Sequence, residues 1–171
     1  MPAQLLKVIN DRDLPIPGSD PWFARPGDSA ITVMTDFRER PSVTIAEAVP
    51  IDAALERMKH AGVRCAFVTS ELRRVSGMIT AYDILGEAPL RFSHAIAGKR
   101  KDVLVRDIMT KLVDWRVVEV CDLEKMSVAT LHQLFESTRL THIAVMESDA
   151  ERPRQLRGLL SASKVKRLLG R

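Results

Sequence analysis

Cysteine is scarce in this sequence, and its scarcity excludes two kinds of site. The 171 residues include two cysteines, Cys65 and Cys121, and neither belongs to a Cys-x-x-Cys pair. This usage excludes a disulfide-stapled secreted scaffold and a cysteine-rich zinc site. It predicts two half-buried, unpaired thiols in a reducing compartment, so we expect a cytoplasmic protein.

Long hydrophobic runs are also missing. No apolar stretch approaches the roughly 20 residues that a helix needs to cross a bilayer. The first residues lack the positive cluster and long apolar core of a secretory signal. We therefore expect no membrane among the partners of this chain.

Catalytic motifs are absent from the sequence as well. The four histidines are scattered (His60, His94, His132 and His142), and none has a second histidine three or four residues away. No Ser/His/Asp order stands out, and no glycine-rich phosphate loop is present. The sequence therefore predicts a protein that is not an enzyme, holds no metal and requires no cofactor.

Charge is unevenly distributed along the chain. The net charge is +4, and seven of the 26 Lys and Arg residues fall within residues 150–171, against one acid, Glu151. Such a tail is either a solvated face or a contact for an anionic partner or ligand. A total of +4 is a weak field for DNA, so nucleic acid is not an expected partner.

Proline, by contrast, is concentrated at the start. Five of the nine prolines lie in the first 26 residues, and proline blocks helix interiors and central strands. We expect an irregular arm over residues 1–29. Trp22 and Phe23 lie inside it, and two adjacent aromatics suggest that the arm is pinned to its own domain or to a second subunit.

The rest of the chain repeats itself. Residues 63–68 resemble residues 140–145, which lie 77 positions later, and Gly77 to Thr80 resembles Gly158 to Ser161, which lie 81 positions later. The four extra residues fall in a turn within 148–154, where insertions disturb no core. One duplication explains the pattern, with a first repeat over 30–87, a linker over 88–102 and a second repeat over 103–171.

Each repeat predicts helix, strand, turn, strand and helix. The expected strands are 65–69, 75–80, 142–146 and 156–161, and short helices follow at 81–85 and before Gly170. Longer helices begin after Pro50 and after Ser127, a plausible N-cap. The methionines in these apolar runs are expected to be core filler.

At this point the chain resembles the CBS domain family, in its tandem arrangement known as a Bateman module. Each repeat opens with a Met-Thr pair, Met34-Thr35 and Met109-Thr110, and each carries a helix followed by a short apolar strand. In the first repeat, Gly77, Thr80 and Asp83 fit the family's Gly-apolar-x-Thr-x-x-Asp signature. The resemblance covers residues 30–171.

The resemblance implies an α+β fold with α/β-type layers. Two β-α-β-β-α units would pack around a pseudo-twofold axis and leave two equivalent clefts. Family members commonly bind AMP, ADP, ATP or S-adenosylmethionine in such clefts. They frequently form homodimers and regulate an effector protein in trans.

The first expected site consists of Arg64, Thr80 and Asp83. A carboxylate accepts hydrogen bonds from a ribose diol, and a threonine hydroxyl suits a ribose or phosphate oxygen. By resemblance, Thr80 and Asp83 are the ribose and phosphate contacts, and Arg64 faces the phosphate. The alternative is that Thr80 and Asp83 only cap the short helix after them.

The second expected site departs from the signature. Lys164 replaces the acid, with Ser161, Thr141 and His142 nearby in the repeat, and an ammonium group cannot accept from ribose hydroxyls. This cleft is either empty or suited to an anionic ligand. The expected function is a nucleotide-sensing regulatory module that signals to a partner by conformational change, and the alternative is a ligand-free platform for dimerisation or protein interaction.

Overall fold

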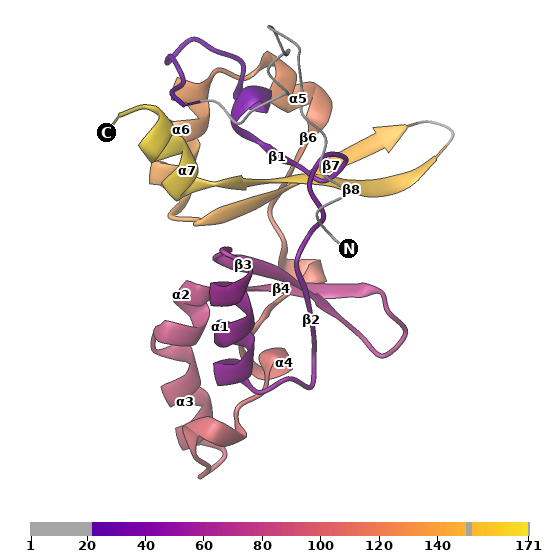
Figure 1. The fold of residues 1–171 in the computed structure, drawn as a ribbon, viewed down its shortest axis with the longest axis vertical. Coiled ribbons are helices and arrows are strands. Elements are labelled where there is room, and N and C mark those ends of the chain that lie inside the picture. Colours follow the sequence, from indigo (N-terminus) through magenta and orange to yellow (C-terminus); the bar gives the residue numbers. More distant parts are fainter. Residues whose placement is uncertain (1–21, 150–151, 171) are drawn as a thin grey trace, which may run out of the picture.

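The computed structural model describes residues 22–149 and 152–170, which form two lobes (Figure 1). Each lobe has a four-stranded sheet, and the two sheets face each other across the middle with helices on their outer sides. Residues 1–21 of the expected arm lie outside the described residues. Residues 22–29 contain no regular helix or strand. Within the described ranges, no helix is long and apolar enough to cross a membrane.

The first lobe is built on the sheet β2-β3-β4-β5. Its strands are β2 (Thr44–Ala46), β3 (Cys65–Thr69), β4 (Val75–Thr80) and β5 (Thr110–Lys111), and its helices are α1 (Ile51–His60), α2 (Ala81–Leu85), α3 (Ala88–Ala95) and α4 (Val105–Ile108). Strands β3 and β4 and helix α2 occupy the ranges predicted for them. The segment 88–102 forms α3 and the 3-10 turn η3 (Arg100–Asp102), which pack on this lobe.

The second lobe is built on the sheet β1-β8-β7-β6. Its strands are β1 (Thr35–Asp36), β6 (Val117–Glu119), β7 (His142–Asp149) and β8 (Arg152–Ser161), and its helices are η2 (Ala30–Val33), α5 (Val120–Lys125), α6 (Val128–Thr138) and α7 (Ala162–Leu168), while η4 (Leu112–Asp114) lies against β4. Ser127 caps α6 by accepting a hydrogen bond from Thr130 N–H at 3.1 Å. Strands β7 and β8 are longer than predicted, because the inserted residues extend the hairpin.

The opening strands of the two repeats cross over. β1 pairs with β8, with Asp36 opposite Gly158, and β5 pairs with β4, with Lys111 opposite Gly77. Each predicted repeat thus supplies the opening strand of its partner repeat's sheet. The hydrophobic cores follow the same exchange, since Val33 is buried in the second lobe.

The two glycines of the repeat signature lie where these opening strands pair closely with β4 and β8. A Cβ on Gly77 would lie 2.6 Å from the carbonyl oxygen of Thr110, and a Cβ on Gly158 would lie 2.6 Å from that of Thr35. Such distances leave no room for any side chain. In each lobe, the Met-Thr pair of one repeat therefore packs directly against the signature glycine of the other repeat.

Charged side chains also hold β1 on β8. The guanidinium of Arg157 pairs with Asp36 and has its Nε 3.6 Å from Glu147 Oε2, and Arg38 pairs with Glu147 as well. The hydrogen bond from Arg157 holds the pKa of the Asp36 carboxyl below its usual value. The Arg157 side chain is 12% exposed, so this pair is sheltered from water.

A third core lies between the two sheets. Its buried members are Cys65, Phe67 and Met78 of the first lobe, and Phe37, Val75, Trp115, Leu156 and Leu159 pack against them. Phe37 meets Phe67 edge to face, with ring centroids 5.4 Å apart. This shared core joins the lobes along one part of their interface and borders the cavity described next.

Candidate functional site

The residues Thr80 and Asp83 form a capping box at the start of α2. Asp83 Oδ2 accepts hydrogen bonds from Thr80 N–H and Thr80 Oγ1, both at 2.7 Å, and Asp83 N–H donates to Thr80 Oγ1 at 3.2 Å. β4 ends at Thr80 because this reciprocal bonding satisfies the first free N–H groups of the helix. The capping role left open by the sequence is therefore present.

A cavity of about 240 Å³ opens beside this cap, between the two lobes. Three segments line it: the end of β4 with the start of α2, the β5–β6 connection, and the turn from α6 into β7. The lining residues are Met78, Thr80, Tyr82, Asp83, Thr110, Asp114, Trp115, Arg116, Arg139, Leu140, Thr141 and His142. The cavity thus combines the signature of one repeat with two segments of the other.

Residues of both charges line this cavity. Arg116 and Arg139 are basic, and Asp83 and Asp114 are acidic. Arg139 ends α6 in the left-handed region, with φ at 57°. Such a backbone is unfavourable for a residue with a side chain, and strained residues of this kind cluster at functional sites.

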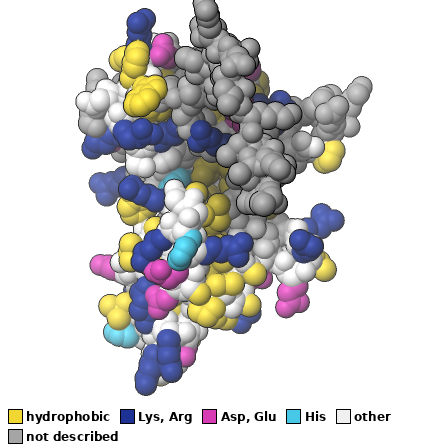
Figure 2. Space-filling view, in the orientation of Figure 1, with side chains coloured by type: hydrophobic (Ala, Val, Ile, Leu, Met, Phe, Trp, Pro, Cys, Tyr) yellow, Lys and Arg dark blue, Asp and Glu magenta, His cyan; other side chains and the backbone are white. Residues whose placement is uncertain are grey.

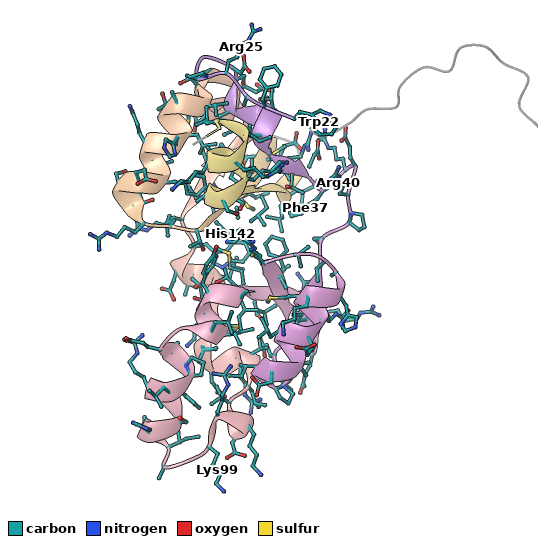
Figure 3. The ribbon with its side chains drawn as sticks, turned by 60° about the vertical axis from the view of Figure 1, so that its left-hand side comes forward. Trp22, Arg25, Phe37, Arg40, Lys99 and His142 are labelled. Carbon is teal, nitrogen blue, oxygen red and sulfur yellow. The ribbon has the colours of Figure 1, made fainter. Side chains whose placement is uncertain are left out.

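His142 is a buried, neutral imidazole at the junction of the lobes (Figure 3). Burial, and secondarily the charge of Arg64, lowers its pKa to about 4. Its Nδ1 lies 3.1 Å from Thr141 Oγ1. A neutral imidazole both donates and accepts hydrogen bonds, so it suits an uncharged polar group such as a nucleobase edge better than a phosphate.

Trp115 provides an aromatic wall. Its indole N–H donates to the Thr110 carbonyl at 3.2 Å, and its ring lies 5.6 Å from that of Phe67, centroid to centroid. Both contacts fix the ring beside the cavity. An aromatic face held in this way is a platform on which a nucleobase can stack.

Comparison with known proteins finds a family match for one segment of the chain. Residues 29–89 match the CBS domain family. This segment is a CBS domain. No curated protein sequence matches the chain at a significant level.

Solved structures of CBS proteins share the fold of the whole chain. CBSX2 from Arabidopsis thaliana, crystallised in complex with AMP, is 21% identical, with a TM-score of 0.56 over 82% of this chain and 95% of that one. A CBS-domain-containing protein from Agrobacterium tumefaciens is 17% identical, with a TM-score of 0.57 over 83% and 95% of the two chains. A hexameric CBS-CP12 protein from bloom-forming cyanobacteria is 24% identical, with a TM-score of 0.54 over 81% and 66%. The chain therefore has the tandem CBS fold.

The sequence assigned one site to each repeat, but the structure groups the predicted site residues differently. Thr80 and Asp83, predicted for the first site, share the cavity with Thr141 and His142, predicted for the second. The reason is the pseudo-twofold arrangement, in which the turn after the long helix of one repeat faces the signature of the other.

The remaining predicted residues do not line this cavity. Arg64 lines a second cavity of about 470 Å³ between α1 and α2, with its Nη1 3.5 Å from Tyr82 Oη. Ser161 and Lys164 line neither of these two cavities. Ser161 Oγ is instead 2.9 Å from Ser163 Oγ.

Sequence reasoning missed the basic and aromatic part of the cavity. Arg139 lies 77 residues after Gly62, so the repeat offset marks it as the start of the turn that faces the signature. Trp115 and Arg116 follow the Met109-Thr110 pair by a few residues. Both signals were visible, but only the crossed strands show which cleft they enter.

Proposed function

We propose that this protein is a regulatory module that binds an adenosine-containing nucleotide in the cavity between its lobes. The carrying observation is that one cavity unites Thr80 and Asp83 with Arg116 and Arg139. A ribose acceptor and two phosphate donors are the chemistry that such a ligand needs. The AMP complex of the similarly folded CBSX2 supports this ligand class.

The capping box is the proposed ribose contact. Among the described residues, Asp83 accepts its two side-chain hydrogen bonds on Oδ2, and one of them comes from the rotatable Thr80 hydroxyl. A ribose diol would donate to the same carboxylate while the Thr80 backbone N–H keeps its bond. The Thr80 hydroxyl would then turn toward a ribose or phosphate oxygen.

The other walls match the remaining parts of a nucleotide. Neutral His142 and the Trp115 ring suit the base, through hydrogen bonding and stacking. Arg116 and Arg139 suit the phosphate, since a guanidinium binds phosphate oxygens in a bidentate manner.

The size of the cavity links occupancy to a change of shape. At about 240 Å³ it is smaller than the roughly 300–1,000 Å³ of typical ligand sites. A nucleotide would therefore bind better to a wider arrangement of the lobes, and differential affinity of this kind shifts a conformational equilibrium. We propose that a partner protein reads the wider arrangement. No catalytic step is part of this proposal.

Thermal unfolding and titration calorimetry with AMP, ADP, ATP and S-adenosylmethionine test the proposal. A ligand at about 100 times its Kd adds roughly 2.7 kcal/mol of stability. At about 2–4 °C per kcal/mol, Tm should rise by roughly 5–11 °C. We expect at least one of the four to do so.

The matched variants are Asp83→Asn and Asp107→Asn. Asp107 accepts a hydrogen bond from Leu104 N–H at 2.8 Å in an equivalent helix cap, but it does not line the cavity. We expect Asp83→Asn to weaken binding about tenfold or more, and Asp107→Asn to leave the affinity unchanged. Equal effects of both variants would mean that Asp83 acts only as a cap.

A ligand-free interaction platform is the second candidate. The observation in its favour is that Thr80 and Asp83 already satisfy each other's hydrogen bonds. This candidate predicts a Tm that none of the four nucleotides changes.

A further inference from the structure

Arg139 has a backbone conformation that residues with side chains rarely adopt. It ends α6 in the left-handed region, with φ at 57° and ψ at 17°. The corresponding turn of the first repeat has Gly62, with φ at 66°. Glycine adopts this conformation readily because it has no Cβ, whereas an arginine there is strained. The second repeat therefore loses stability by having arginine at this turn.

The strain at Arg139 coincides with the cavity between the lobes. Among the described residues, three that are not glycine have a positive φ, namely Arg73, Ala97 and Arg139. Arg73 lies in the β3–β4 turn and Ala97 follows α3, and neither lines the two cavities described above. Arg139 lines the cavity between the lobes. Backbone strain at a cavity points to a ligand contact, because such strain persists at binding sites.

The guanidinium of Arg139 takes no part in holding the fold together. In the described parts of the chain, it has neither an ion pair nor a hydrogen bond. By contrast, the guanidinium of Arg157 pairs with Asp36. Figure 2 shows Lys and Arg side chains on both sides of the line where the two lobes meet. An unpaired guanidinium at a cavity suits a group with two anionic oxygens, which it binds through two parallel hydrogen bonds.

We propose that Arg139 makes this site selective for ligands with a phosphate group, and that its strained backbone is kept for this role. The inference rests on the proposed function and narrows its ligand class. A phosphate has the anionic oxygens that the guanidinium binds. S-adenosylmethionine has a cationic sulfonium where AMP has its phosphate, and adenosine has no anion there. The site should therefore prefer AMP to both.

Two glycine variants separate the strain from the binding role. Arg139→Gly removes the strain and the guanidinium at the cavity, and Arg73→Gly removes the same strain and charge from a turn outside both cavities. Without ligand, each variant should have a Tm roughly 2–4 °C above that of the parent. A Tm of Arg139→Gly at or below that of the parent would show that arginine is not strained there, and this result would overturn the proposal.

Titration calorimetry with AMP, adenosine and S-adenosylmethionine measures the selectivity. The parent should bind AMP at least tenfold more tightly than the other two ligands. Arg139→Gly should lose most of this ratio by weakening AMP binding alone, and Arg73→Gly should keep it. Arg139→Lys should keep part of it, because an ammonium has the charge without the planar fork. A ratio of affinities is insensitive to a general change in the shape of the cavity.

The failure of this proposal can be told from the failure of the proposed function. A parent that binds AMP no better than adenosine would leave a site without phosphate selectivity. An unchanged ratio in Arg139→Gly, or an equal loss in Arg139→Gly and Arg73→Gly, would leave a selective site in which Arg139 has no special part. Each of these results contradicts the inference alone. If none of the three ligands binds the parent, the proposed function is wrong and the inference fails with it.

Discussion

Replacing Gly77 with alanine places a methyl group where β5 pairs with β4. The new Cβ would lie 2.6 Å from the Thr110 carbonyl oxygen and 2.9 Å from Met109 Sδ. The methionine is flexible but the carbonyl belongs to backbone, so β5 must move. Gly158→Ala does the same to β1, with 2.6 Å to the Thr35 carbonyl oxygen.

The size of the effect follows from the overpacking. Forcing a methyl group into a packed site costs about 1–3 kcal/mol, which lowers Tm by roughly 2–12 °C for a chain of this length. Gly27→Ala is the control, because its Cβ meets nothing within 4 Å and its φ lies outside the left-handed region. There the smaller entropy of the unfolded chain should raise stability by about 0.4–1 kcal/mol.

The two variants should differ in ligand binding. β5 continues into Asp114, Trp115 and Arg116 of the cavity, whereas β1 contributes no residue to it. We expect Gly77→Ala to weaken AMP binding as well as stability, and Gly158→Ala to lower stability alone. Differential scanning calorimetry and titration calorimetry measure the two quantities.

Two results would refute this reasoning. Gly77→Ala unfolding within about 1 °C of the parent would show that β5 is not seated as described. Equal loss of AMP affinity in Gly77→Ala and Gly158→Ala would show that the cavity does not depend on β5.

Three further predictions concern titratable groups. Burial lowers the pKa of His142 to about 4, so the unfolded chain binds more protons than the folded one below about pH 6.5. The free energy of unfolding should therefore fall by up to about 3 kcal/mol between about pH 6.5 and pH 4. In urea unfolding measured over this pH range, His142→Gln should show a smaller fall. Burial raises the pKa of the Cys65 thiol to about 12, while Cys121 is exposed, so a thiol reagent should label one cysteine in the native protein and two in urea; rapid labelling of both would contradict this. Asp36→Asn removes the charge that pairs with the mostly buried Arg157 and should lower the free energy of unfolding by about 1–3 kcal/mol at neutral pH. Because the pKa of Asp36 is lowered in the folded state, the parent should keep this advantage above about pH 3.8 and lose it as the pH falls further, until its stability equals that of the variant.

Local patterns predicted the hairpin strands and short helices well. β3, β4 and α2 have strong local signals, namely short apolar runs bounded by polar turns and a Thr-x-x-Asp cap, so the sequence predicts their bounds. β1 and β5 have two residues each. Strands this short have no period of their own, and their pairing depends on a glycine far along the chain.

The candidate site was predictable only in part, for the same reason. Thr80 and Asp83 lie three residues apart, so their joint position follows from local geometry. The partners Arg116 and Arg139 come from the other repeat, and the sequence signals that mark their positions do not show which cleft they enter. Which cleft Arg64 or His142 enters depends on the crossing of the lobes, which residue spacing within one repeat does not encode.

The crossed strands also set the order of events during synthesis. Asp36 pairs with Gly158, 122 positions later, so at about 5–20 residues per second the first strand waits roughly 6–24 s after it is made before its partner is translated. During that time the sheet of the first lobe can close completely, because its last strand, β5, is translated 47 residues before Gly158. The sheet of the second lobe, which needs both β1 and β8, is therefore the last part of the molecule that can form.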